Sequence, residues 1–212
     1  MRKLFFILQV IIACSCSSYS DDIEEVLKQA GKNRVELEKV LKHYAKESKD
    51  SLRLRAAEFL IVNMPGKYSE YYDAPWNNVA TVHLRWSSSS EKQMVLDTYD
   101  LEKPVIQEDI EHITADYLIN NIDLAFKVWE ETPWGKYIPF DAFCEDILPY
   151  RVSTEPLENW REQALASFAD PYREFLKNPS TTSVAACQKI NTLLPRFRMD
   201  IDFPVNLTST IR

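Results

Sequence analysis

The chain has 212 residues, of which 45% are hydrophobic, which is enough to bury one substantial core or two small ones. Only three residues are glycine, which argues against glycine-rich phosphate-binding loops and against an all-β fold with many tight turns. The formal net charge is −7 and Lys and Arg form no cluster, which argues against nucleic acid as a partner because phosphate binding requires a basic surface.

Residues 1–13 are predicted to be a lipoprotein signal peptide. Arg2 and Lys3 form a positive start, and the apolar run 4–13 is too short to span a bilayer as a stable helix. The run ends in IIAC, residues 11–14, which resembles a bacterial lipobox. An ordinary cleaved signal peptide is the other interpretation.

Cys14 is the predicted lipidation site and the predicted mature N-terminus. Cys16 is an alternative, less favoured because Ala13 would then stand where lipoboxes usually carry Leu. Acyl chains on Cys14 would anchor the chain in the cell envelope, on a bacterial membrane facing the periplasm or the exterior. The small polar residues 14–20 would form a tether.

Residues 21–195 are predicted to form a mainly α domain, a bundle-like array of amphipathic helices. Apolar residues recur there with the i, i+3, i+4, i+7 spacing of one helix face. The segments with this pattern are about 21–30, 33–44, 51–63, 114–131, 140–148, 157–171 (broken near Pro171) and 181–194.

Individual residues give these helices predicted starts and faces. Asn33 with Glu36 three residues later fits a capping box, and Thr114 is expected to cap the longest helix. Leu52 is expected to face inward in the third helix.

Residues 67–104 do not follow the helical pattern. Residues 79–86 alternate apolar and polar side chains with a period of two, which indicates a strand, and QMVL at 93–96 is a candidate partner. A small β-hairpin around 79–98 is one interpretation, and an irregular excursion from the helical domain is the other.

Cys144 is the first candidate nucleophile, because acidic residues flank it in FDAFCEDIL at 140–148. Phe140, Phe143 and Cys144 nevertheless fall on one helical stripe. The thiol is therefore expected to face the core, where burial and neighbouring acids raise its pKa and make it a poor nucleophile.

No other cluster predicts a catalytic, cofactor or metal site. Cys187 is expected to be half-buried in the last helix, and the spacing of the cysteines predicts no disulfide. The histidines His43, His83 and His112 all precede Cys144, and none has metal-ligand spacing.

Aromatic residues give a candidate binding surface. A glycan or a peptide is the expected ligand class for aromatic side chains in an irregular segment, here 68–86. The candidate ligand-binding residues are Tyr71, Tyr72, Trp76 and Trp86.

Two stretches carry a family resemblance. The first is GKNRVELEKVLKHYAKESKDSLRLRAAEFLIVNMPG at 31–66, and the second is ITADYLINNIDLAFKVWEETPWGKYIPFDAFCEDILPYRVSTEPLENWR at 113–161. Together they resemble the N-terminal helical region of transglutaminase-like lipoproteins of Bacteroidetes-type bacteria. The resemblance covers about residues 28–66 and 105–212, and is weaker across 67–104.

In that family the helical region precedes a papain-like core with a Cys-His-Asp triad. Residues 196–212 resemble the segment that leads into this core, so the chain is expected to be the front part of such a protein, truncated or separated from its remainder. The resemblance implies a non-catalytic accessory domain whose partners are the membrane and a downstream transglutaminase-like core. The alternatives are an envelope binding module using 68–86 and a cysteine-dependent enzyme using Cys144 or Cys187.

Overall fold

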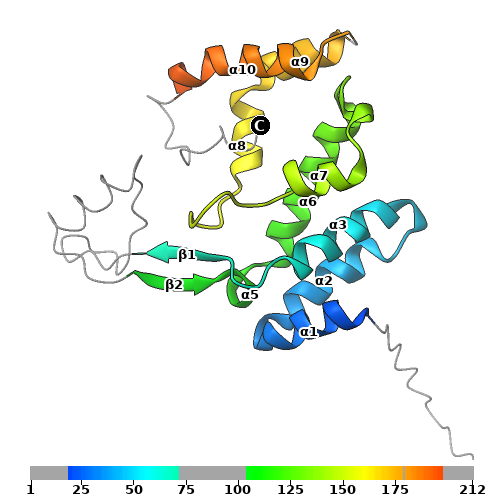
Figure 1. Cartoon of the computed structure of the whole chain (residues 1–212), viewed down its shortest axis with the longest axis vertical. Helices are drawn as coiled ribbons and strands as arrows, with labels where there is room; N and C mark the ends of the chain where they lie inside the picture. Colours follow the sequence, from blue (N-terminus) through cyan, green and yellow to red (C-terminus); the bar gives the residue numbers. More distant parts are fainter. Residues whose placement is uncertain (1–18, 72–103, 179, 198–212) are drawn as a thin grey trace, which may run out of the picture.

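The computed structural model describes residues 19–71, 104–178 and 180–197, and over these residues the protein is mainly helical (Figure 1). The predicted mainly α fold is confirmed, and a small two-stranded antiparallel sheet accompanies the helices. The α-helices of the described residues are α1 Asp21–Gln29, α2 Arg34–Tyr44, α3 Ser51–Val62, α5 Asp109–His112, α6 Ala115–Glu131, α7 Phe140–Asp146, α8 Trp160–Ser167, α9 Ala169–Lys177 and α10 Ser183–Phe197.

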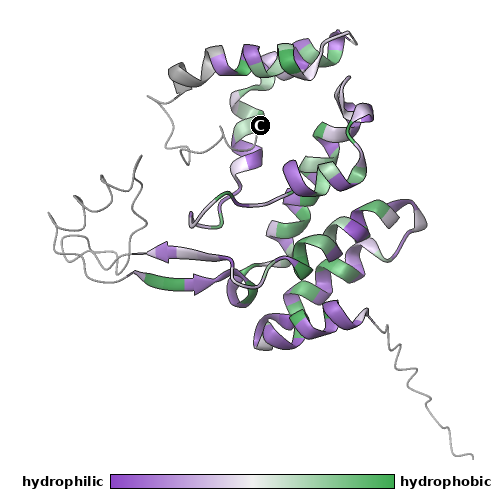
Figure 2. Ribbon diagram, viewed as in Figure 1, coloured by the Kyte–Doolittle hydropathy of each residue, from purple (hydrophilic) through white to green (hydrophobic). Residues whose placement is uncertain are grey.

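The hydrophobic core lies where α1, α2 and α3 pack with the long helix α6. Leu118 and Ile122 of α6 are buried, as their spacing predicted, and each contributes about 1.5–3 kcal/mol to folding. Ring packing extends the core to α7. The ring centroids of Phe126 and Trp129 lie 4.9 and 4.5 Å from the ring centroid of Phe143. Figure 2 shows hydrophobic and hydrophilic residues on the same helices, as amphipathic packing requires.

The start of α6 is capped as predicted, whereas the face predicted for α3 is partly wrong. The Thr114 hydroxyl accepts a hydrogen bond from the Tyr117 backbone N–H at 3.3 Å. Leu52, expected inward, is 39% exposed. The buried face of α3 is centred between Ala57 and Leu60, and Leu52 lies about 110° from that centre at 100° per residue.

The capping box predicted at Asn33 and Glu36 is wrong. Asn33 has helical backbone angles, and its side-chain amide donates instead to the carbonyls of Ile110 and Ile113, at 3.0 and 2.9 Å. The Glu36 carboxylate accepts from the Ala115 backbone N–H at 2.8 Å. Both side chains therefore satisfy backbone groups at the α5–α6 junction, nearly eighty residues away in sequence, rather than the start of their own helix.

The sheet pairs two strands that the sequence did not identify. Strand β1, Tyr68–Tyr71, runs antiparallel to β2, Val105–Glu108. On its other edge, β1 meets a segment from much later in the chain, because the Glu70 N–H donates to the Thr154 carbonyl at 3.0 Å. The hairpin predicted around 79–98 lies outside the described residues.

The predicted helix 157–171 is two helices, α8 and α9, and the break lies at Phe168 rather than at the proline. Pro171 lies in the first turn of α9, where a missing N–H leaves no intrahelical bond unmade. The Tyr172 hydroxyl donates to Glu131 at 2.8 Å, which attaches α9 to the end of α6. In Figure 1, α9 and α10 lie across the end of the molecule opposite α1.

Candidate functional site

Cys144 lies on the inner face of α7 and is 3% exposed. Burial raises the pKa of its thiol to about 11, and the carboxylate of Asp141 acts in the same direction. Asp141 and Glu145 are exposed, because they lie off the helical stripe that Cys144 shares with Phe140 and Phe143. The expectation that Cys144 faces the core is therefore confirmed, and very little thiolate is present at neutral pH.

Cys144 also contributes to the lining of a surface hollow of about 390 Å³ between α1, α3 and α7. A nucleophilic thiol requires a base within hydrogen-bonding distance. No histidine is among the residues that line this hollow: His43 and His112 are exposed on α2 and α5, and His83 lies outside the described residues. The part of the chain that the structure describes therefore forms no Cys–His dyad around Cys144.

Of the remaining sequence candidates, the structure describes Cys187 and Tyr71. Cys187 is half-buried on α10, as expected. Tyr71 is half-buried at the end of β1. Outside the described residues lie Cys14, Cys16, Tyr72, Trp76 and Trp86.

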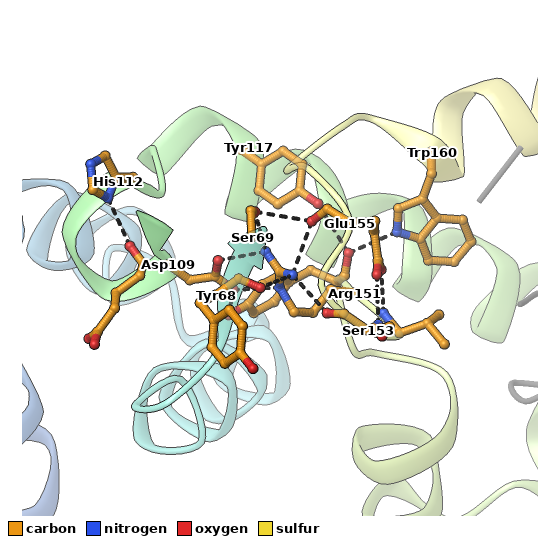
Figure 3. A network of polar contacts seen from close by, with 12 residues as sticks. Tyr68, Ser69, Asp109, His112, Tyr117, Arg151, Ser153, Glu155 and Trp160 are labelled. Atoms are coloured by element: carbon orange, nitrogen blue, oxygen red, sulfur yellow. Dashed lines mark hydrogen bonds and ion pairs between the residues drawn. The ribbon is translucent and has the colours of Figure 1, made fainter. Parts of the chain in front are cut away.

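The main polar cluster is one that the sequence did not reveal, and it is centred on Arg151 (Figure 3). The Arg151 side chain is only 6% exposed. Its Nη1 donates to the carbonyls of Tyr68, Ser153 and Glu155 at 2.7, 2.8 and 3.0 Å. One guanidinium nitrogen therefore holds β1 and the turn 151–155 together.

Asp109 supplies the opposite charge to Arg151. Arg151 Nη2 donates to Asp109 Oδ1 at 2.6 Å, and Arg151 Nε lies 2.5 Å from Oδ2. The second contact is an ion pair whose angle does not suit a hydrogen bond, so the buried Nε has a charge partner but no acceptor. Arg151 Nη2 also donates to Ser69 Oγ at 3.1 Å, which ties the pair to β1.

Asp109 is 1% exposed, and the Tyr150 hydroxyl donates to its Oδ2 at 2.9 Å. Burial raises the pKa of Asp109 above its usual value, although Arg151 and Tyr150 both favour the carboxylate. Burial, together with Asp109, also raises the pKa of Tyr150. We name the cluster of Ser69, Asp109, Tyr150 and Arg151 the Arg151 hub.

A second arginine, with a buried guanidinium group on a half-buried residue, lies next to the hub. Arg161 Nε donates to Asn121 Oδ1 at 2.7 Å, and its Nη2 donates to the carbonyls of Ile147 and Pro149, the latter at 3.0 Å. Its guanidinium also lies 4.4 Å from the ring centroid of Trp160. Arg161 thereby fastens the start of α8 to α6 and to the turn after α7.

Local sequence gave only a weak signal for the hub. Asp109 lies in VIQEDIEHI, where it and two neighbouring acids, Glu108 and Glu111, look equally suited to solvent, and Arg151 is 42 residues away. The weak clue is Arg151 itself, since it follows directly on the buried residues Leu148 and Tyr150, and a charge in such a place needs a partner.

The hub is arranged for structure rather than for acid–base chemistry. Arg151 donates to main-chain carbonyls, to Ser69 Oγ and to Asp109, and Asp109, the carboxylate of the hub, is itself 1% exposed. Among the described residues, no three or more His, Cys, Asp or Glu side chains are placed to hold a metal ion. Over the same residues, no helix is both long enough and apolar enough to cross a membrane.

Comparison with known proteins adds no relative. No protein-family model matches the chain, and searches of curated proteins and of solved structures give no significant match.

Proposed function

We propose that this chain supplies a non-catalytic helical scaffold domain to a cell-envelope lipoprotein of the transglutaminase-like type, anchored to a bacterial membrane through acylated Cys14. The burial of Cys144 is the observation that carries the proposal, because it removes the best-placed nucleophile. The buried charges of the domain support the same role, since Arg151 and Arg161 bind main-chain carbonyls that would otherwise lack partners.

The anchor and the family come from the sequence: the IIAC stretch at 11–14 and the two segments that resemble the helical region of these lipoproteins. A rigid domain placed between a lipid anchor and a catalytic core would hold that core away from the membrane surface. This role requires a stable fold and no reactive side chain.

The reactivity of Cys144 tests the absence of catalysis. In a full-length chain with Cys14, Cys16 and Cys187 replaced by Ser, only Cys144 remains to react with iodoacetamide. With a pKa of about 11 instead of the ordinary 9, Cys144 should be roughly 100-fold less ionised at neutral pH, even before burial slows access. We therefore expect alkylation at least roughly 100-fold slower in the folded protein than in urea.

The matched control retains Cys187 and replaces Cys144 with Ser. Its half-buried thiol should react faster than Cys144 in the folded protein. A folded-state rate for Cys144 equal to or above its rate in urea would contradict the scaffold proposal and favour a cysteine-dependent enzyme.

A further inference from the structure

A second hollow, of about 480 Å³, opens between the start of α6 and the start of α8. Its volume is in the range of sites for small ligands. Its lining combines a small apolar surface with pairs of amides and carboxylates, and His112 and Thr114 complete it. The pairs are Tyr117 and Leu157, Asn120 and Asn159, Asp116 and Glu162. Neither Cys144 nor any of residues 68–71, the described part of the aromatic segment, is among its lining residues.

Both walls of this hollow are fixed to one atom, the carbonyl oxygen of Tyr150. The Tyr117 hydroxyl donates to it from α6 at 3.0 Å, and Trp160 Nε1 donates to it from α8 at 2.9 Å. The rings of Tyr117 and Tyr150 also meet edge to face, with centroids 6.2 Å apart. The geometry of the hollow is therefore set before any ligand arrives, which lowers the entropic cost of binding.

The amides and carboxylates offer hydrogen bonds of both senses. Asn120 Nδ2 lies 3.4 Å from Asn159 Oδ1, a long contact that a better partner can replace at little cost. Each amide presents two N–H donors and an acceptor, and each carboxylate presents acceptors only. A ligand that uses all of them must carry groups that both donate and accept, and hydroxyl groups do so.

Charge and polarity exclude other ligands. Asp116 and Glu162 outnumber His112, the one basic side chain of the lining, so the hollow repels phosphates and carboxylates. A lipid chain would leave the polar lining without partners. An ammonium group would satisfy the carboxylates but would offer no acceptor to the N–H groups of Asn120 and Asn159.

We propose that this hollow binds a neutral saccharide unit, whose hydroxyl groups bond to Asn120, Asn159 and the two carboxylates while its C–H face lies against Tyr117 and Leu157. Such a site would let an envelope scaffold hold a surface glycan without any catalytic group.

Calorimetric titration of the full-length chain with glucose, N-acetylglucosamine and maltose tests the proposal. We expect at least one of the three to bind with a Kd of about 1 mM or tighter. The double variant Asn120→Ala/Asn159→Ala should weaken that binding by about tenfold or more. Glu162→Gln, at an exposed position that leaves the fold intact, should weaken it by about threefold.

The matched control is Asn63→Ala, because Asn63 is an exposed amide that lines the other hollow. It should leave the saccharide Kd unchanged. No binding of any of the three sugars would overturn the proposal, as would binding that survives both the double variant and Glu162→Gln, or binding of putrescine in place of the sugars. None of these results would alter the alkylation rate of Cys144, so the scaffold proposal is tested separately.

Discussion

Arg151 and Arg161 lie ten residues apart in the sequence, and both guanidinium groups are buried, but different kinds of partner stabilise their charges. Arg151 has a carboxylate partner, Asp109, at 2.5–2.6 Å. For Arg161 the described residues supply only neutral acceptors, the Asn121 amide oxygen and two carbonyls, together with the ring of Trp160. Burial accordingly lowers the pKa of Arg161 to about 10.

The two arginines also differ in how far apart in the sequence the segments that they join lie. Arg151 joins segments that are far apart in the chain, because its partners lie on β1, in α5 and in its own turn. Arg161 closes a nearby turn, 147–149, and adds one contact to α6. The ion pair therefore fixes tertiary structure, whereas the neutral contacts cap a local turn and hold α8 in place.

Removing the acid of the Arg151 hub should have the largest effect. In Asp109→Ala the Arg151 guanidinium and the Tyr150 hydroxyl both stay buried without the oxygen acceptors that Asp109 offers them even when it is protonated. We expect the free energy of unfolding to fall by about 3–5 kcal/mol, measured by urea denaturation. The control Asp141→Ala, at an exposed position on α7, should change it by less than about 0.5 kcal/mol. A loss below about 1 kcal/mol for Asp109→Ala would mean that water reaches Arg151.

Removing Arg161 should cost less, because no buried charge is left behind. Arg161→Met keeps an apolar side chain of similar length but leaves Asn121 and two carbonyls without their donor. We expect a loss of about 1–3 kcal/mol, seen as a lower urea midpoint. The exposed Arg173→Met should stay within about 0.5 kcal/mol of the parent. A loss for Arg161→Met equal to that of Asp109→Ala would remove the distinction between the two arginines.

The sequence predicted those features that depend on local spacing. The buried stripe of α6, the Thr114 cap and the inward face of Cys144 each follow from residues within two helical turns of one another. Burial of such a stripe contributes the same free energy whichever helix covers it, so the prediction does not require knowledge of the partner.

The features that the sequence missed are set by contacts between distant residues. YSEY and VIQE show no two-residue alternation, and they pair because the Arg151 hub holds β1 in place. Asn33 and Glu36 have the residue types and the spacing of a capping box, which is why a local cap was predicted. Their side chains instead form hydrogen bonds with backbone groups at the α5–α6 junction. The hollow between α6 and α8 could not be predicted either, since the carbonyl of Tyr150 that positions both walls has no sequence signature.

The smallest expected effect is in the pH dependence of the free energy of unfolding, which should differ between the Arg151–Asp109 pair and Arg161. Burial raises the pKa of Asp109 in the folded protein above its value in the unfolded chain. The folded state therefore takes up this proton at a higher pH than the unfolded state does. Stability from Asp109 is thus lowest above the raised folded pKa, increases as the pH falls through it, and levels off below the ordinary value of about 3.9.

The measurement compares urea midpoints of the parent protein with those of Asp109→Asn and Arg161→Met from pH 7 down to about pH 3. The difference between the parent and Asp109→Asn should shift in favour of the parent as the pH falls, because only the parent gains the proton. The difference between the parent and Arg161→Met should stay flat, since Arg161 keeps its charge throughout that range. A shift in the opposite direction for Asp109→Asn would show that Arg151 and Tyr150 stabilise the carboxylate by more than burial destabilises it.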